Sequence, residues 1–99
     1  MVAEVHVDQR KLAGFCQGAH IRRLAFFGSV LGPDFRPDSD VDVLVEFEPD
    51  QEPGFIALAR MEEDLSAIIG REVDLLTSDD LSQYFRDRVL AEAQVQYAA

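Results

Sequence analysis

Two aspartates near the middle of the chain have the residue type and the spacing to bind a divalent cation. Asp40 and Asp42 lie two positions apart at the start of an apolar run that continues to Phe47. Side chains alternate between the faces of a strand, so a strand over this run places both carboxylates on one face. Carboxylates this close repel unless a cation neutralises them, and oxygen-only ligands favour Mg²⁺ or Mn²⁺ over zinc. The alternative is a solvent-facing acidic strand start, but Leu44 on the same face indicates that this face becomes buried.

A Gly-Ser pair stands upstream of these aspartates, with ten residues between Ser29 and Asp40. It follows the short apolar run Leu24–Phe27, which is typical of a buried strand. Gly28 lets the backbone approach phosphate oxygens, and the Ser29 hydroxyl and the turn amides are donors for them. Taken alone, the pair is better explained as a strand-ending turn with a serine cap. Together with the aspartates it indicates metal-assisted phosphoryl chemistry.

A third aspartate lies in a later apolar run. The segment Glu72–Leu76 predicts a strand on which Asp74 and Leu76 share a face. If this strand is a neighbour of the strand that carries Asp42, Asp74 can join the metal site. The alternative is a single aspartate at an exposed sheet edge.

The elements that must position these residues follow from apolar periodicity and from end signals. Asp8 is the expected N-cap of a first helix that ends near Gly18, and a second helix is predicted over Phe55–Ile69 with Gly70 as its terminator. A brief helical turn is expected over residues 29–32, and the strand that begins at Val41 is expected to reach Glu48.

A last helix is predicted after the third strand, capped by Ser78 or Asp79. Its evidence is a stripe of apolar residues at i+4 spacing: Leu81, Phe85, Val89, Ala93 and Tyr97. The order of elements predicts an α+β fold at the borderline of α/β, with a small mixed sheet of about three strands packed with helices. The apolar stripe permits oligomers without requiring them.

The bulk properties narrow the classes of function. With 99 residues and 47% apolar composition, the chain is expected to form a single domain over residues 1–99. A net charge of -10 argues against direct nucleic-acid binding and fits docking onto a basic partner. One cysteine, no apolar stretch near the ~20 residues of a membrane span and no signal pattern predict a cytoplasmic protein.

The motif residues carry a family resemblance. The run FFGSVLGPDFRPDSDVDVLVEFEP resembles the active-site core of the DNA polymerase beta-like nucleotidyltransferase superfamily, in which Gly-Ser precedes Asp-x-Asp. The resemblance is closer to the minimal nucleotidyltransferase (MNT) group, whose C-terminal half is similar to the run EVDLLTSDDLSQYFRDRVLAEAQVQY. It therefore covers the chain from about Ile21 to the end. The resemblance implies that the chain has the fold of the polymerase beta-like nucleotidyltransferase core.

The resemblance implies Mg²⁺-dependent transfer of a nucleotidyl group, with ATP as the expected substrate. It implies that the catalytic and metal-binding residues are Asp40, Asp42 and Asp74, which would hold two Mg²⁺ ions, with Mn²⁺ as an alternative. In this scheme Asp74 is a general base or a ligand of the second metal. Gly28 and Ser29 would bind the triphosphate.

The chain departs from the MNT pattern at one position. MNT sequences usually carry an arginine four positions after the motif glycine, where this chain has Gly32. Loss of that arginine removes a charge-assisted contact to the triphosphate, worth ~1.5–3 kcal/mol in general. Arg36 is close enough in sequence to replace it, and we include Arg36 among the expected nucleotide-binding residues.

Resemblance to MNT proteins of the MntA type implies a type VII antitoxin, the MNT half of a HEPN–MNT toxin–antitoxin pair. The MNT member would transfer AMP to a tyrosine of the HEPN ribonuclease toxin. One alternative is an antitoxin with a weakened site that inhibits its toxin by complex formation. Another is a free-standing enzyme that modifies a small molecule, which the lack of room for an acceptor domain disfavours. The sequence leaves open the nucleotide preferred, the number transferred and the acceptor residue.

Overall fold

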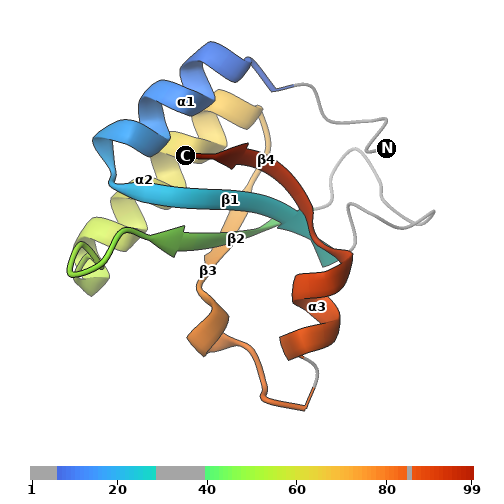
Figure 1. The fold of residues 1–99 in the computed structure, drawn as a ribbon. Coiled ribbons are helices and arrows are strands. Elements are labelled where there is room, and N and C mark those ends of the chain that lie inside the picture. Colours follow the sequence, from blue (N-terminus) through green and yellow to red (C-terminus); the bar gives the residue numbers. More distant parts are fainter. Residues whose placement is uncertain (1–6, 29–39, 85) are drawn as a thin grey trace.

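The computed structural model describes residues 7–28, 40–84 and 86–99. Its helices are α1 (Gln9–Gly18), α2 (Phe55–Ile69) and α3 (Arg86–Glu92), with a short 3₁₀ helix η2 (Ser78–Asp80). Its strands are β1 (Ile21–Phe27), β2 (Val41–Phe47), β3 (Val73–Leu76) and β4 (Gln94–Ala98), in the sheet order β3-β2-β1-β4. β1 is antiparallel to both β2 and β4, whereas β2 and β3 are parallel (Figure 1). The expected α+β fold with a small mixed sheet is confirmed.

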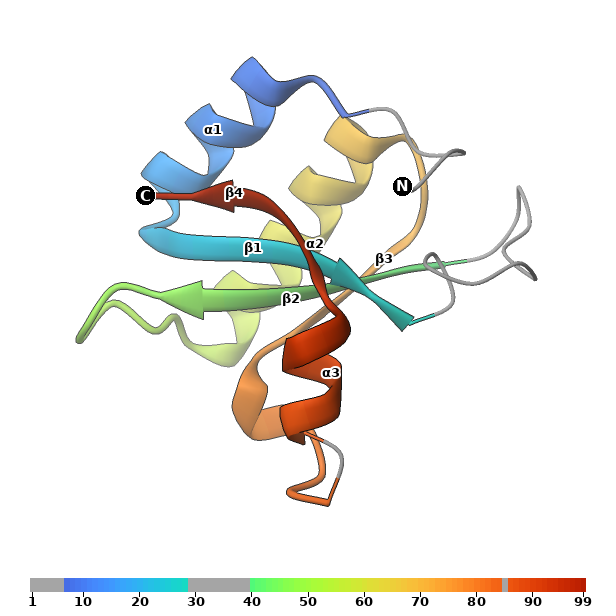
Figure 2. The same ribbon diagram turned by 45° about the vertical axis from the view of Figure 1, so that its right-hand side comes forward.

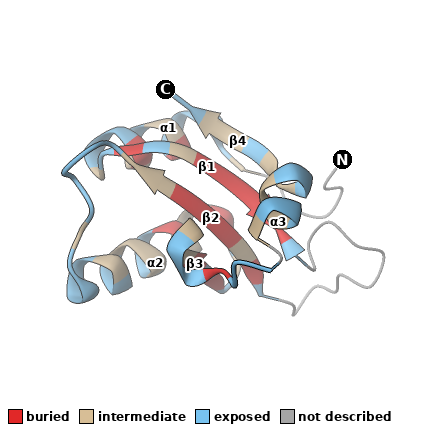
Figure 3. Cartoon of the chain, turned by 60° about the horizontal axis from the view of Figure 1, so that its bottom comes forward, coloured by how far each residue is buried: buried red, intermediate tan, exposed pale blue. Residues whose placement is uncertain are grey.

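Helices cover both faces of this sheet (Figures 1 and 2). The strand residues alternate between the faces, as a period of two requires. Val43 belongs to the main core, whereas Leu44 packs with Phe27 and Leu81 in a second cluster on the opposite face. The α1 and α2 helices contribute to the first cluster, and α3 contributes Val89 and Leu90 to the second. Figure 3 shows the buried residues concentrated along the two central strands.

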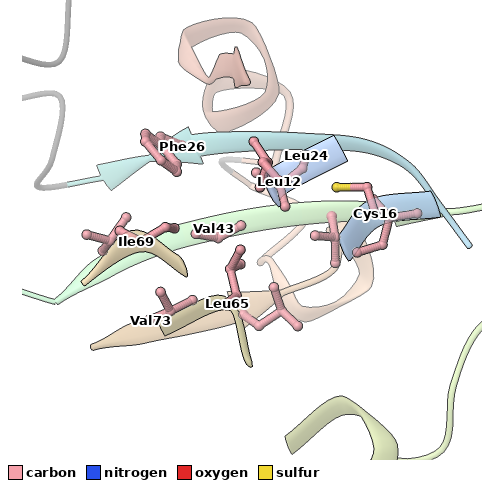
Figure 4. Packing of buried hydrophobic residues seen from close by; sticks show 12 residues of the cluster. Leu12, Cys16, Leu24, Phe26, Val43, Leu65, Ile69 and Val73 are labelled. Atoms are coloured by element: carbon pink, nitrogen blue, oxygen red, sulfur yellow. The ribbon is translucent and has the colours of Figure 1, made fainter. Parts of the chain in front are cut away.

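The main core lies between the sheet and the pair α1 and α2. Figure 4 shows Leu12 of α1 and Leu65 of α2 facing Val43 and Val73 of the sheet. Cys16 is buried in this core, and burial raises the pKa of its thiol to about 12. A thiol with such a pKa is a packing group and a poor nucleophile.

The predicted helix ends are confirmed for the first two helices. The Asp8 carboxylate accepts hydrogen bonds from the amides of Arg10 and Lys11 and so caps α1. α2 ends at Gly70, whose φ of 79° is a left-handed conformation that suits a residue without a Cβ. The predicted turn over residues 29–32 lies outside the described residues.

The C-terminal segment differs from the prediction of one long helix. Thr77, rather than Ser78 or Asp79, caps the short helix η2 in a capping box with Asp80. α3 begins only at Arg86, and the chain then forms β4, in which Tyr97 pairs with Leu24 of β1. The sheet therefore has four strands and not about three. The open edge of β1 offers backbone hydrogen bonds that outweigh a weak helical pattern, and Gln94–Ala98 alternates polar and apolar residues as a strand does.

No helix in the described part of the chain is long and apolar enough to cross a membrane.

Candidate active site

Sheet pairing brings two of the three predicted carboxylates together. Asp42 and Asp74 are register partners on the neighbouring parallel strands β2 and β3. Residues directly opposite each other across a strand pair point to the same face, here the face with Leu44 and α3. Asp42 is half-buried and Asp74 is exposed, so the pair lies at the rim of a buried surface. The condition under which Asp74 could join the site, that its strand is a neighbour of the strand that carries Asp42, is met.

Gly28 follows the last residue of β1 and lies against the Asp42 carboxylate. Phe27, the preceding residue, is the register partner of Asp42. Gly28 has a φ of 76°, and a Cβ built on it would overlap Oδ2 of Asp42. The left-handed backbone favours glycine here, and a Cβ would fit only if the Asp42 carboxylate moved away. The end of β1, the start of β2 and the middle of β3 thus converge on Asp42.

Asp40 is exposed and immediately precedes β2. The amide of the next residue, Val41, donates to the carbonyl of Glu72 at 2.8 Å, which fixes the start of β2 against the strand that carries Asp74. Among the residues that the structure describes, no three Asp, Glu, His or Cys side chains are grouped closely enough to hold a metal ion. Asp42 and Asp74 are thus brought together, but Asp40 does not complete a three-carboxylate cage.

The carboxylate pair nevertheless fits a magnesium ion. Mg²⁺ prefers oxygen ligands, keeps several waters, and is usually held by one or two carboxylates together with substrate phosphates. Two opposed carboxylates at a partly exposed rim match that donor set better than they match zinc, which takes nitrogen and sulfur ligands. Ser29 and Arg36, the predicted triphosphate ligands, and Gly32 lie outside the described residues.

On the face of the sheet that carries α3, a hydrogen bond links α3 to the end of η2. Arg86 Nη2 donates to the carbonyl of Leu81 at 3.0 Å, and Leu81 packs with Phe27 and Leu44. Phe27 and Leu44 lie close to Gly28 and Asp42 along β1 and β2. The hydrogen bond from Arg86 therefore stabilises the apolar cluster that lies next to the site.

The sequence pattern did not single out Glu62 of α2, whose Oε2 accepts a hydrogen bond from the amide of Leu75 at 2.9 Å. Leu75 follows Asp74 directly. Glu62 stands in the acidic run Glu62-Glu63-Asp64, and nothing in that run distinguishes a residue that faces β3 from its solvated neighbours. His20, by contrast, is exposed at the far end of β1, 3.7 Å from Glu48, and takes no part in the site.

Comparison with known proteins identifies the family of this chain. The family described as nucleotidyltransferase domain matches residues 9–95. The protein adenylyltransferase MntA of Thermococcus cleftensis is 36% identical over 72 residues, which cover 73% of this chain and 71% of the relative.

Solved structures share the fold. One is a toxin–antitoxin with AMP-PNP, with a TM-score of 0.72, 17% identity, and coverage of 94% of this chain and 75% of that one. Another is a tri-AMPylated Shewanella oneidensis HEPN toxin in complex with an MNT antitoxin, with a TM-score of 0.64, 16% identity, and coverage of 92% and 70%. At these identities the likeness establishes the fold alone. The match over residues 9–95 and the MntA relative establish more: this chain belongs to the nucleotidyltransferase domain family.

Proposed function

We propose that this protein is an Mg²⁺-dependent protein adenylyltransferase that transfers AMP from ATP to a tyrosine of a HEPN ribonuclease toxin, and thereby acts as its antitoxin. The observation that carries the proposal is the opposition of Asp42 and Asp74 across β2 and β3, with Gly28 against Asp42. Family membership supports nucleotidyl transfer, and the MntA relative is a protein adenylyltransferase. The AMPylated toxin bound to an antitoxin of this fold supports the partner.

In the proposed reaction the tyrosine oxygen attacks the α-phosphorus of ATP. The bond from that phosphorus to the bridging oxygen breaks, and pyrophosphate leaves. Bound Mg²⁺ would supply neutralisation of the triphosphate charge and would lower the pKa of the attacking hydroxyl. Asp42 and Asp74 would hold the metal, with Asp40 completing the set when the nucleotide is present. We assign Asp74 the alternative role of accepting the tyrosine proton.

Gly28 leaves room for the Asp42 carboxylate, which lies where a side chain would project, and its backbone would approach the phosphate groups beside that carboxylate. Ser29 and Arg36 are proposed to bind the triphosphate on the strength of the sequence motif. Positioning and charge neutralisation would then provide most of the rate enhancement, as is general for phosphoryl transfer.

The charge of the chain suits a basic toxin as acceptor. A net charge of -10 favours association with a cationic surface such as one that binds RNA. AMP on that surface adds a bulky anionic group, which would repel RNA and block its access.

A second candidate function is an antitoxin that inhibits by complex formation alone. Gly32, in place of the arginine usual in MNT sequences, favours it, because a weaker hold on the triphosphate slows transfer. Both candidates require the same partner, so they differ in whether covalent transfer occurs.

The deciding experiment incubates the purified chain with ATP, Mg²⁺ and a candidate HEPN toxin, sought first in the neighbouring reading frames, and then measures the intact mass of both proteins. We expect the toxin to gain one or more units of about 329 Da, the mass of an AMP group, and peptide mapping to place them on tyrosine. Asp42→Ala should abolish the gain, whereas Glu63→Ala, which also removes an acidic group but lies on the exposed side of α2, should not. A stable complex without any mass gain would support the second candidate instead.

A further inference from the structure

Two side chains of α2 accept hydrogen bonds from backbone amides of the edge strand β3. The Leu75 amide donates to Glu62 Oε2 at 2.9 Å, and the Val73 amide donates to Ser66 Oγ at 3.1 Å. Successive amides along a strand point to opposite sides, so these are the amides that point away from β2. An edge strand ordinarily leaves such donors to water or to another chain. Here each of the two has a fixed protein acceptor.

The two acceptors form one unit on α2. Glu62 and Ser66 are four residues apart, which places them one above the other on the same helix face. The Ser66 hydroxyl donates to the Glu62 carbonyl at 2.8 Å, and this bond leaves an oxygen lone pair for the Val73 amide. The orientation of the Ser66 hydroxyl is therefore fixed within α2 itself, independently of β3.

The acceptor of the Leu75 amide is a carboxylate oxygen, at the rim of a pocket. Glu62 is half-buried and lines an open surface pocket of about 310 Å³, whose other residues are mainly apolar: Phe55, Leu58, Ala59, Leu75, Leu76 and Asp80. A hydrogen bond to an ionised carboxylate is about twice as strong as a neutral one.

The two bonded amides belong to the residues on either side of Asp74. Val73 and Leu75 are buried in the core, whereas Asp74 points to the opposite face, toward Asp42. Holding the amides on both sides limits rotation of the backbone at Asp74. The direction of its Cα–Cβ bond, and hence the place of its carboxylate relative to Asp42, is limited with it.

We propose that Glu62 and Ser66 are positioning residues of the active site, which act through β3 to hold the Asp74 carboxylate opposite Asp42. The inference rests on the proposed function, because it takes Asp74 as a residue of the metal site. A purely structural role, in which the two side chains only cover a sheet edge, would affect stability or self-association but not metal affinity.

The test uses the full chain and two readouts. The first is Mn²⁺ binding, measured as the loss of the free-ion signal in electron paramagnetic resonance. The second is the kcat and the KM for ATP of AMP transfer to the toxin. Glu62→Ala should weaken Mn²⁺ binding and lower kcat by about 10- to 100-fold, the usual effect of removing a group that orients a metal ligand. The KM for ATP should change less than kcat, because the proposed triphosphate ligands Gly28, Ser29 and Arg36 do not belong to β3.

Two variants separate positioning from general damage. Glu62→Gln keeps an oxygen that accepts from the Leu75 amide and should restore most of the Mn²⁺ affinity. Glu63→Ala removes the same charge from the neighbouring exposed residue and should behave as wild type. If Glu62→Ala does not fold, Ser66→Ala takes its place, with an expected loss of about tenfold in Mn²⁺ affinity.

Wild-type Mn²⁺ affinity and kcat in folded Glu62→Ala would overturn the proposal, as would a Gln variant as impaired as the Ala variant. The proposed function can fail separately. If the wild type binds Mn²⁺ without transferring AMP, transfer is refuted while the Mn²⁺ readout still decides the role of Glu62. If the wild type binds no Mn²⁺ at all, the positioning role is overturned too.

Discussion

At the scale of single residues, the site depends on the absence of a side chain at Gly28 as much as on the carboxylates. The residue combines a φ of 76° with a place where any Cβ would overlap Asp42. A motif glycine is usually explained by the approach of a phosphate to the backbone. In this fold it also leaves the Asp42 carboxylate free of a steric clash, so the same residue would serve both the proposed metal ligand and the proposed nucleotide site.

Replacing Gly28 by alanine should therefore damage the site more than the fold. We expect Gly28→Ala to lower the free energy of unfolding by roughly 1–2 kcal/mol through left-handed strain, and to displace Asp42 so that AMP transfer is lost. Thermal denaturation and the mass-based transfer assay would measure the two effects. Gly14→Ala is the matched control: its Cβ would meet nothing within 4 Å, so the helical site should gain about 0.5–1 kcal/mol with transfer intact. Full transfer by Gly28→Ala would contradict this account.

At the scale of secondary structure, the connection from β2 through α2 to β3 creates the site. A helical crossover makes the two strands parallel, and the register then sets Asp42 opposite Asp74. On the other side, η2 and α3 cover Leu44 and Phe27, so the carboxylates stand at the edge of a buried patch. Arg86 ties these two short elements together through the carbonyl of Leu81.

We expect Arg86→Ala to lower the free energy of unfolding by about 1 kcal/mol, because it removes a charge-assisted hydrogen bond and the packing of the arginine stem. The loss is not larger because the buried Nε of Arg86 has no hydrogen-bond partner among the described residues, so its removal offsets part of the cost. Chemical denaturation would measure the change. Arg88→Ala, which breaks only an exposed ion pair with Glu92, should cost no more than about 0.5 kcal/mol. Equal losses in both variants would show that the contact to Leu81 contributes nothing.

At the scale of the whole molecule, the net negative charge is the feature that most affects association with a partner. The chain carries a net charge of -10 on 99 residues. Like charges at this density keep a small protein soluble and attract a cationic partner over distances longer than a contact.

Association with a basic toxin should therefore depend strongly on salt. We expect the association rate constant to fall by about tenfold or more between roughly 0.05 and 0.5 M NaCl, with a smaller change in the dissociation rate. Surface plasmon resonance across a salt series would measure both. A rate independent of salt would mean that the partner surface is not cationic, and would weaken the case for a toxin that binds RNA.

Much of the fold and the motif could be predicted from local sequence. Asp8 and Gly70 mark helix ends through interactions with residues close in the chain, so their roles could be inferred without tertiary structure. The alternation that set Asp42 and Asp74 on defined faces is likewise a local property of a strand. The metal-binding and nucleotide-binding roles of Asp40, Asp42, Asp74, Gly28, Ser29 and Arg36 stay predictions, which the experiments above address.

The sequence by itself thus determined the family, the order of the first elements and the faces of the strands, because these depend on contacts within a few residues of each other. Only the tertiary structure decided three further features. Gln94–Ala98 became a strand because β1 had an unpaired edge, Asp42 met Asp74 because β2 and β3 are in register, and Glu62 reached the Leu75 amide because α2 packs beside β3. Each is a contact between segments distant in the chain, and composition or periodicity carries no record of which distant segments will meet.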